Sequence, residues 1–337
     1  MSKVDPYRTW WPRYGHRVRP QPHVGLRVDD APDEIWDLPG ELTDDTMLRP
    51  RPQRAERGWR GAVVTATGGR VNPGLGVEEI RGRDQHHRIT GPLADPHHVA
   101  ITSIKGGVGK TTIAACLGLV LSEHRGDRVV ALDANPDAGT LADRLTGESE
   151  VTVRNLLRDL PRIESWNDIA RYTSLAGRLQ VVASEQDPAM SAAFSRAEYE
   201  DVIALLSRYF NITITDSGTG LVHSAMAGTL GVAQSLVIAG APTVDGASRA
   251  SKTLDWLSAH GHDALVKDAV VVLSQDRCSR EVDVETVVRH FRSRCREVVE
   301  VPHDPHLATG ARVEPARLHR RTLAAFTELA AVVSDRF

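Results

Sequence analysis

The stretch that decides the fold runs from Val99 to Thr112 and reads VAITSIKGGVGKTT. It begins with a short apolar run rich in β-branched residues, which predicts a buried strand. The glycines that follow allow a tight turn whose backbone N–H groups can surround an anion without a Cβ in the way. A helical pattern starts near Lys110, so a helix N-terminus would face the same anion. The stretch therefore predicts a phosphate-binding loop between a strand and a helix.

The loop departs from the usual pattern, G-x-x-x-x-G-K-[ST], at two positions. Ile104 stands where the first glycine is expected, and an additional lysine, Lys105, precedes the glycines. In loops of this kind the lysine corresponding to Lys110 contacts the β- and γ-phosphates, and the hydroxyl of Thr111 binds Mg²⁺. The predicted phosphate-binding residues are Gly106, Gly107, Val108, Gly109, Lys110, Thr111 and Thr112.

Acidic residues that follow two other apolar runs would complete such a site. Asp216 comes after the run ITIT, where an aspartate that holds the Mg²⁺ shell would lie. Asp133 comes after VVAL, with Asn135 and Asp137 close behind. Open α/β sheets bind ligands at the carboxyl ends of their strands. Either aspartate alone is compatible with a helix cap or a turn, but the loop beside them favours a nucleotide site.

From residue 98 onward, short apolar runs alternate with helical patterns. Strands are expected at 98–104, 127–134, 179–184, 211–217, 235–241, 269–274 and 297–302. Helices are expected at 111–124, 151–160, 197–210, 247–261, 282–295 and 320–337. This alternation predicts an α/β fold with a doubly wound, mostly parallel sheet and helices on both of its faces.

The first 57 residues differ from the rest, because they are rich in Pro and Arg and carry charge in blocks. Such a segment cannot bury enough apolar surface to fold alone, so a disordered arm is expected over residues 1–57. Trp10, Trp11 and Trp36 would dock on a partner or fold back onto the core. Residues 58–95 read as a short helix or strand, a Gly-Gly turn and a connector that packs on the core. Residues 96–337 form the predicted nucleotide-binding domain.

Composition excludes several classes of protein. The net charge of −3 and the pI near 6.5 argue against a general nucleic-acid binder. No apolar run approaches the roughly 18 residues of a membrane span, and the N-terminus lacks the apolar core of a secretion signal. Cys116, Cys278 and Cys295 lie far apart, which predicts reduced cysteines in a cytoplasmic protein. The histidine pairs at 86–87 and 97–98 lack metal-ligand spacing and are expected at the surface.

The motif KGGVGKTT, with a lysine before the glycines, resembles the deviant phosphate loop of the MinD/ParA family of ATPases. VVALDANPD and ITDSGTG are similar to the two switch strands of that family. The resemblance implies a P-loop NTPase fold with ATP and Mg²⁺ as ligands, and Thr111 and Asp216 at the metal. It also implies that Lys105 reaches the phosphates of a second subunit, so that ATP joins two monomers and hydrolysis releases them.

Longer stretches resemble the EspI-like MinD/ParA ATPases, which accompany type VII (ESX) secretion systems in mycobacteria and other actinobacteria. These stretches include GWRGAVVTATGGRVNPG and LDANPDAGTLADRL, and the resemblance spans residues 58–337. It implies a protein partner in a secretion complex, contacted through the N-terminal arm. The protein would then be cytoplasmic, recruited to a membrane-embedded complex, and would meet the membrane only indirectly.

Asn135 is a departure from the family pattern, in which a second acid positions the attacking water. An amide orients water but does not accept its proton, so slow hydrolysis is expected unless Asp137 substitutes. The catalytic set implied by the resemblance is Lys105, Lys110, Asp133, Asn135 and Asp137. Pro302 and Asp304 correspond to the family's adenine-binding segment.

Two alternatives remain open from the sequence. The protein could be an ATP-binding regulator or sensor with negligible hydrolysis. It could also be a ParA-type partition ATPase that binds DNA through a basic face. The basic cluster available for that role consists of Arg312, Arg317, His319, Arg320 and Arg321, which is small for a DNA-binding surface.

Overall fold

The computed structural model describes residues 54–55, 58–103, 106–135, 139–185, 195–218, 224–275 and 281–337. These residues belong to two compact units, and the chain passes from one to the other between Arg83 and Asp84. Of the arm expected over residues 1–57, only Arg54 and Ala55 are described, so its disorder stays a prediction. Among the described residues, no helix has the length and apolar character needed to cross a membrane.

The smaller unit contains helix α2 (Gly58–Ala66) and the first part of helix α3 (Val77–Ile89). The predicted glycine turn follows α2, and both Gly68 and Gly69 have positive φ. Arg60 donates from Nη1 to the carbonyl oxygens of Pro73 and Leu75, at 3.1 and 3.0 Å, which holds the returning chain against α2. The sequence left helix and strand open for this segment, and the structure has a helix.

The larger unit is built on an eight-stranded sheet with the order β3-β4-β2-β5-β1-β6-β7-β8. Its strands are β1 (His97–Thr102), β2 (Val129–Ala134), β3 (Ser174–Ala176), β4 (Leu179–Val182), β5 (Ile212–Ser217), β6 (Ser235–Gly240), β7 (Val270–Ser274) and β8 (Glu297–Val301). All pairings are parallel except β3 with β4. The predicted doubly wound, mostly parallel sheet is confirmed.

Helices connect these strands on both sides of the sheet. They are α4 (Lys110–His124), α5 (Leu141–Leu145), α6 (Val153–Asp159), α7 (Trp166–Ile169), α8 (Arg196–Ser207), α9 (Ser224–Val232), α10 (Val244–Ala259), α11 (Asp263–Lys267), α12 (Val284–Arg292), α13 (Pro305–Ala308) and α14 (Arg320–Ser334). Three 3-10 turns are η1 (Leu160–Arg162), η2 (Ala170–Tyr172) and η4 (Pro315–Arg317). The short helices and β3 were not expected from the sequence, because five or fewer residues carry no readable period.

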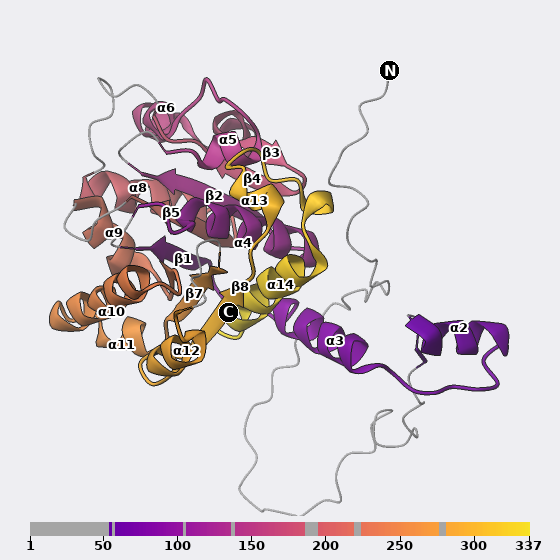
Figure 1. Cartoon of the computed structure of the whole chain (residues 1–337). Helices are drawn as coiled ribbons and strands as arrows, with labels where there is room; N and C mark the ends of the chain where they lie inside the picture. Colours follow the sequence, from indigo (N-terminus) through magenta and orange to yellow (C-terminus); the bar gives the residue numbers. More distant parts are fainter. Residues whose placement is uncertain are drawn as a thin grey trace, which may run out of the picture. The chain divides into compact units, whose positions relative to one another are not determined.

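Alternation along the strands divides the core between the two faces of the sheet. Val99 and Ile101 of β1 join the cluster under α4 and α14, whereas Ala100 between them joins the cluster with α9 and α10. Figure 1 shows α4 and α14 side by side over one face and α8, α9 and α10 over the other. Because both faces are covered, every residue of β1, β2, β5 and β6 is buried.

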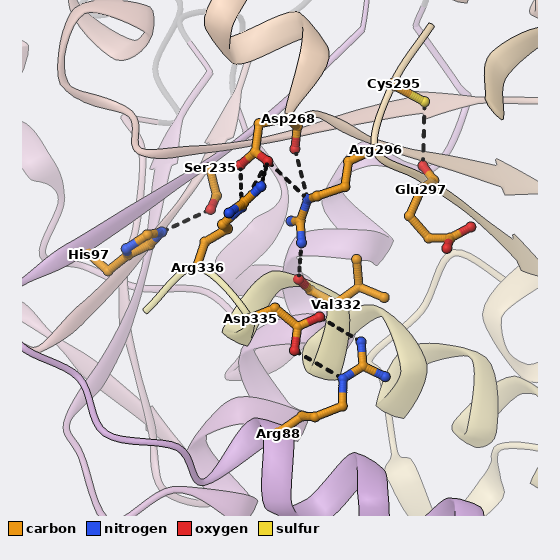
Figure 2. A network of polar contacts seen from close by, with 10 residues as sticks. All are labelled: Arg88, His97, Ser235, Asp268, Cys295, Arg296, Glu297, Val332, Asp335 and Arg336. Carbon is orange, nitrogen blue, oxygen red and sulfur yellow. Dashed lines mark hydrogen bonds and ion pairs between the residues drawn. The ribbon is translucent and has the colours of Figure 1, made fainter. Parts of the chain in front are cut away.

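A network of charged side chains lies at the edge of the sheet where the strands begin (Figure 2). Asp268, just before β7, accepts a hydrogen bond of 2.8 Å from Nε of Arg336 and pairs at 3.2 Å with Nε of Arg296. Arg296 also donates from Nη1 to the carbonyl oxygen of Val332 in α14 at 2.8 Å. The network joins the start of the sheet to the end of the last helix.

The same edge corrects the expectation that the histidine pairs are all at the surface. His97 and His98 are buried because other segments cover both faces of the central strand β1: the ring of Phe337 lies 4.7 Å from that of His97, and the Ser207 hydroxyl of α8 lies 3.2 Å from Nε2 of His98. His97 shares a hydrogen bond of 2.8 Å with the hydroxyl of Ser235. His86 is half-buried against His124, with 3.1 Å between their Nδ1 atoms, and His87 is exposed. Cys116 and Cys295 are free and buried.

Candidate nucleotide-binding site

The glycine loop after β1 has the backbone that its sequence predicts. Gly107 and Gly109 have φ of 75° and 90°, in the left-handed region where a Cβ would be strained. Gly109 is the residue immediately before α4, and a Cβ there would lie 3.4 Å from the hydroxyl of Ser274. A glycine turn that leads directly into a helix N-terminus is the backbone arrangement that anion sites use. Ile104 and Lys105 lie outside the described residues.

A cavity of about 400 Å³ opens beside the loop. It is lined by residues of the loop and the first turn of α4, namely Gly107, Gly109, Lys110, Thr111 and Thr112, and by residues of other segments, namely Thr140, Asp143, Arg144 and Gly310. Lys110 is 8% exposed, and burial lowers the pKa of its ammonium group, while the Asp216 carboxylate opposes that shift. A buried cation at the mouth of an anion-binding turn is an arrangement suited to phosphate.

Thr111, which lines this cavity, meets Asp216, although the two residues come from different parts of the chain. The Thr111 hydroxyl donates a hydrogen bond to the Asp216 carboxylate at the end of β5. Asp216 is 2% exposed, and its Oδ1 has no hydrogen-bond partner among the described residues. Burial raises the pKa of Asp216, against the Thr111 hydrogen bond and the charge of Lys110. An unsatisfied buried carboxylate oxygen beside a hydroxyl fits a cation.

These two side chains would supply a hard cation with only part of its shell. Mg²⁺ prefers oxygen ligands and keeps several waters or substrate phosphates among them. No group of three or more His, Cys, Asp or Glu side chains suited to a metal exists in the described part of the chain. The donor set therefore fits Mg²⁺ delivered with a nucleotide better than a permanently held metal ion.

Asp133 lies directly opposite Asp216 in the pairing of β2 with β5. It is fully buried, and its oxygens accept hydrogen bonds from the backbone amides of Asn135 at 3.1 Å and Leu141 at 3.0 Å. Burial and the neighbouring Asp216 charge raise the pKa of the Asp133 carboxyl. The side chain thus links the ends of β2 and β5 to the start of α5, because Leu141 is the first residue of that helix.

Gly139 packs against the Asp133 carboxylate more closely than any side chain would permit. A Cβ on Gly139 would lie 1.9 Å from Oδ1 and 2.2 Å from Oδ2 of Asp133. Sequence reasoning did not select Gly139, since a glycine in DANPDAGT reads as an ordinary turn residue. Nor did it select Arg144, because a charged pair such as Asp143–Arg144 in the short segment LADRL reads as an ordinary surface feature.

Several predicted site residues are not brought together with this cavity. Asp137 lies outside the described residues, as does Lys105. Asp304 is fully buried, and its carboxylate accepts hydrogen bonds from the backbone amides of His306 at 3.0 Å and His319 at 2.9 Å. Neither Pro302 nor Asp304 lines the cavity. Adenine contact by these two residues stays a prediction, and the structure gives the Asp304 side chain a role in capping α13.

Comparison with known families agrees with this geometry. Residues 99–293, from the first strand through the glycine loop and both aspartates, match the model of the CobQ/CobB/MinD/ParA nucleotide-binding domain. The chain belongs to this MinD/ParA family. The family resemblance noted in the sequence is confirmed.

Relatives of this MinD/ParA chain include the ESX-1 secretion-associated protein EspI of Mycobacterium tuberculosis, which is 34% identical over 287 residues. That match covers 84% of this chain and 43% of EspI, so the chain spans less than half the length of this relative.

Solved structures share the fold of the MinD/ParA chain. A ParA family ATPase from Chlorobium tepidum has a TM-score of 0.61 at 16% identity, over 70% of this chain and 98% of that one. The septum site-determining protein MinD of Pyrococcus horikoshii, solved with Mg-ADP, has a TM-score of 0.56 at 20% identity, over 70% of this chain and 94% of that one.

Proposed function

We propose that this protein is an ATP-dependent molecular switch that binds Mg-ATP at the cavity beside the glycine loop and hydrolyses it slowly. The observation that carries the proposal is the meeting of Lys110, Thr111 and Asp216 at one anion-binding turn. Membership of the MinD/ParA family supports ATP as the nucleotide.

In this proposal each residue has a distinct role in binding. The loop amides and Lys110 hold the phosphate chain, with Lys110 at the β- and γ-phosphates. Thr111 and Asp216 would hold Mg²⁺, which when bound neutralises charge on the phosphates. Asp133 would anchor Asn135 and Leu141 beside the γ-phosphate position, through the two backbone hydrogen bonds described above.

Slow hydrolysis is proposed because Asn135 occupies the position after β2 where many relatives of this kind have a second acid. Its backbone amide is anchored on Asp133, so the residue is held near the catalytic carboxylate. Its side chain can orient a water molecule but cannot accept the proton that the water must lose. Lys105 and Asp137 complete the proposed catalytic set.

The proposed context is a type VII secretion system, and the support is the resemblance to EspI. ATP would join two copies of the chain, with Lys105 of each copy reaching the other's phosphates. The protein would be cytoplasmic and would be recruited to the secretion complex through its N-terminal arm. Because the chain spans 43% of EspI, this context is proposed for the nucleotide-binding part alone.

The decisive experiment measures Mg-ATP binding by calorimetry on the full chain and on Lys110→Ala. Loss of the buried cation is expected to weaken binding at least about tenfold, since charge-assisted hydrogen bonds to phosphate would be removed. Lys252→Ala is the matched control, because Lys252 is exposed on α10, far from the loop in the sequence. Equal binding by both variants would reject the site.

The second candidate is a nucleotide-binding regulator with negligible hydrolysis, which Asn135 also favours. Single-turnover assays with purified protein distinguish it from a slow ATPase, because a regulator would leave bound ATP intact. Rapid unstimulated turnover would contradict both. Affinity purification with the wild type and Lys110→Ala tests the secretion context, and recovery of secretion ATPase components with only one of them supports it. ATP-dependent co-sedimentation with DNA would instead indicate a partition function.

A further inference from the structure

We infer that Arg144 is a second phosphate-binding cation of this site, which reaches the cavity from helix α5 and contacts the nucleotide at its α-phosphate. The inference rests on the proposed nucleotide site and adds a residue that neither the loop motif nor the predicted switch residues include.

The position of Arg144 is the first observation. Its Nη2 donates a hydrogen bond of 2.9 Å to the hydroxyl of Thr112, in the first turn of α4. Both residues line the cavity that Gly109, Lys110 and Thr111 also line. Helices α4 and α5 pack together, as Figure 1 shows, so the guanidinium reaches the loop from a neighbouring element.

The rigidity of the Arg144 backbone is the second observation. Its amide donates to the carbonyl of Thr140 at 3.0 Å, and its carbonyl accepts from the amide of Val313 at 2.7 Å. Nε of Arg312 donates to the carbonyl of Leu145 at 3.0 Å, which ties the same helix to the chain after α13. A braced backbone places the charged group without further loss of conformational entropy when ligand binds.

The chemistry of the side chain completes the argument. Arg144 is 8% exposed, so its charge is only weakly screened by water. A guanidinium presents a planar fork of donors that matches two phosphate oxygens. Asp143 also lines the cavity and carries the opposite charge, but its side chain is exposed, so water screens that charge well.

The order of residues along the loop indicates which phosphate of the nucleotide Arg144 would contact. In a phosphate loop the lysine reaches the β- and γ-phosphates, the next hydroxyl takes the metal, and the backbone amides hold the α- and β-phosphates. Thr112 lies one residue beyond the metal-binding position, toward the α end of the chain. An arginine that is hydrogen-bonded to Thr112 would therefore contact the α-phosphate, which ATP and ADP both carry.

The test compares the binding of Mg-ATP and Mg-ADP to wild type, Arg144→Gln and Arg144→Lys by calorimetry. Arg144→Gln keeps a donor for Thr112 but removes the charge, so both nucleotides are expected to bind about tenfold to a hundredfold more weakly. Arg144→Lys keeps the charge but lacks the planar set of guanidinium donors, and it is expected to lose less affinity than Arg144→Gln. Arg317→Gln is the control, because Arg317 is exposed and pairs with Glu314 at the surface.

The outcomes separate this inference from the proposed function. A wild type that binds neither nucleotide rejects the site as a whole, and the inference with it. Wild-type binding that Lys110→Ala abolishes and both Arg144 variants keep within about twofold overturns the inference alone. A loss confined to ATP overturns the α-phosphate contact. Unchanged thermal midpoints of the nucleotide-free variants, with weakened binding, support a ligand contact rather than a structural role.

Discussion

At the scale of single residues, the site depends on close packing around two buried carboxylates. Asp133 and Asp216 face each other across neighbouring strands, and each is surrounded by groups from other segments. The aspartates themselves could be predicted, since each ends a readable apolar run. Their surroundings could not, because Gly139 and Arg144 matter only for what lies next to them in space.

The substitution Gly139→Ala tests the packing around Asp133. The added Cβ would overlap both carboxylate oxygens, at 1.9 and 2.2 Å, so either the carboxylate or the chain before α5 must move. We expect a loss of about 1–3 kcal/mol in the free energy of unfolding, and weaker Mg-ATP binding. Urea unfolding and calorimetry measure the two effects.

A matched glycine elsewhere provides the control for that change. Gly126→Ala adds the same Cβ with no atom within 4 Å of it, and we expect a change of about 0.5 kcal/mol or less. Equal effects of the two substitutions would contradict a specific role for Gly139.

Asn135→Asp tests whether the amide limits hydrolysis. A carboxylate at this position could accept the proton of the attacking water, and we expect the turnover rate to rise by about tenfold. The rate of phosphate release at saturating Mg-ATP is the measurement, with Asn135→Ala as the comparison. An unchanged or lower rate in Asn135→Asp would place the limit elsewhere, since the backbone amide that contacts Asp133 is present in all three proteins.

At the scale of elements, the loops at one edge of the sheet carry the site and the opposite edge carries a charged network. The glycine loop follows β1 and both aspartates lie at the carboxyl ends of β2 and β5, whereas Asp268 and Arg296 precede β7 and β8. The alternation of strands and helices predicted that the site would lie at one edge of the sheet, because the carboxyl ends of parallel strands all lie at the same edge. The ion-pair partners of the arginines in this network could not be predicted from the sequence, because charged residues are common at the ends of helices.

Asp268→Asn tests the contribution of the network to stability. The substitution removes the charge that Arg296 and Arg336 share, and the Arg296 side chain is only 18% exposed. We expect a loss of about 1–2 kcal/mol in the free energy of unfolding, with little change in nucleotide affinity. Glu200→Gln is the control, because its pair with Arg196 is a solvent-exposed contact within one helix, worth about 0.5 kcal/mol or less. Equal losses would show that the network is no more than a surface ion pair.

At the scale of the whole molecule, burial of both sheet faces sets how stability responds to acid. Burial lowers the pKa of His97 and of His124 to about 4, well below the ordinary value. Both imidazoles are therefore neutral in the folded protein and take up protons on unfolding below about pH 6.5. Their contribution to stability is complete above that pH.

We expect this contribution to be lost as the pH falls from about 6.5 toward 4. In that range the unfolding free energy rises with pH because the unfolded chain binds more protons than the folded one. Each histidine that is replaced should remove about one proton from this difference and so make the slope smaller. Urea titrations of wild type, His97→Asn and His124→Asn between pH 4 and 8 measure the slope, and the wild-type comparison cancels the carboxylates. Parallel curves for all three proteins would contradict the expected burial, and His87→Asn is the exposed control.

The sequence by itself determined the fold class, the phosphate loop and the family, because each depends on local order along the chain: apolar period, glycine placement and the residues that end each strand. The tertiary structure alone decided which groups surround the glycine loop and the two carboxylates. Arg144, Gly139 and Leu141 reach them from beyond the second strand, and His97 contacts Ser235 and Phe337, which come more than a hundred residues later. Distances through space between remote segments follow from how the sheet is ordered, and no local pattern in the chain encodes them.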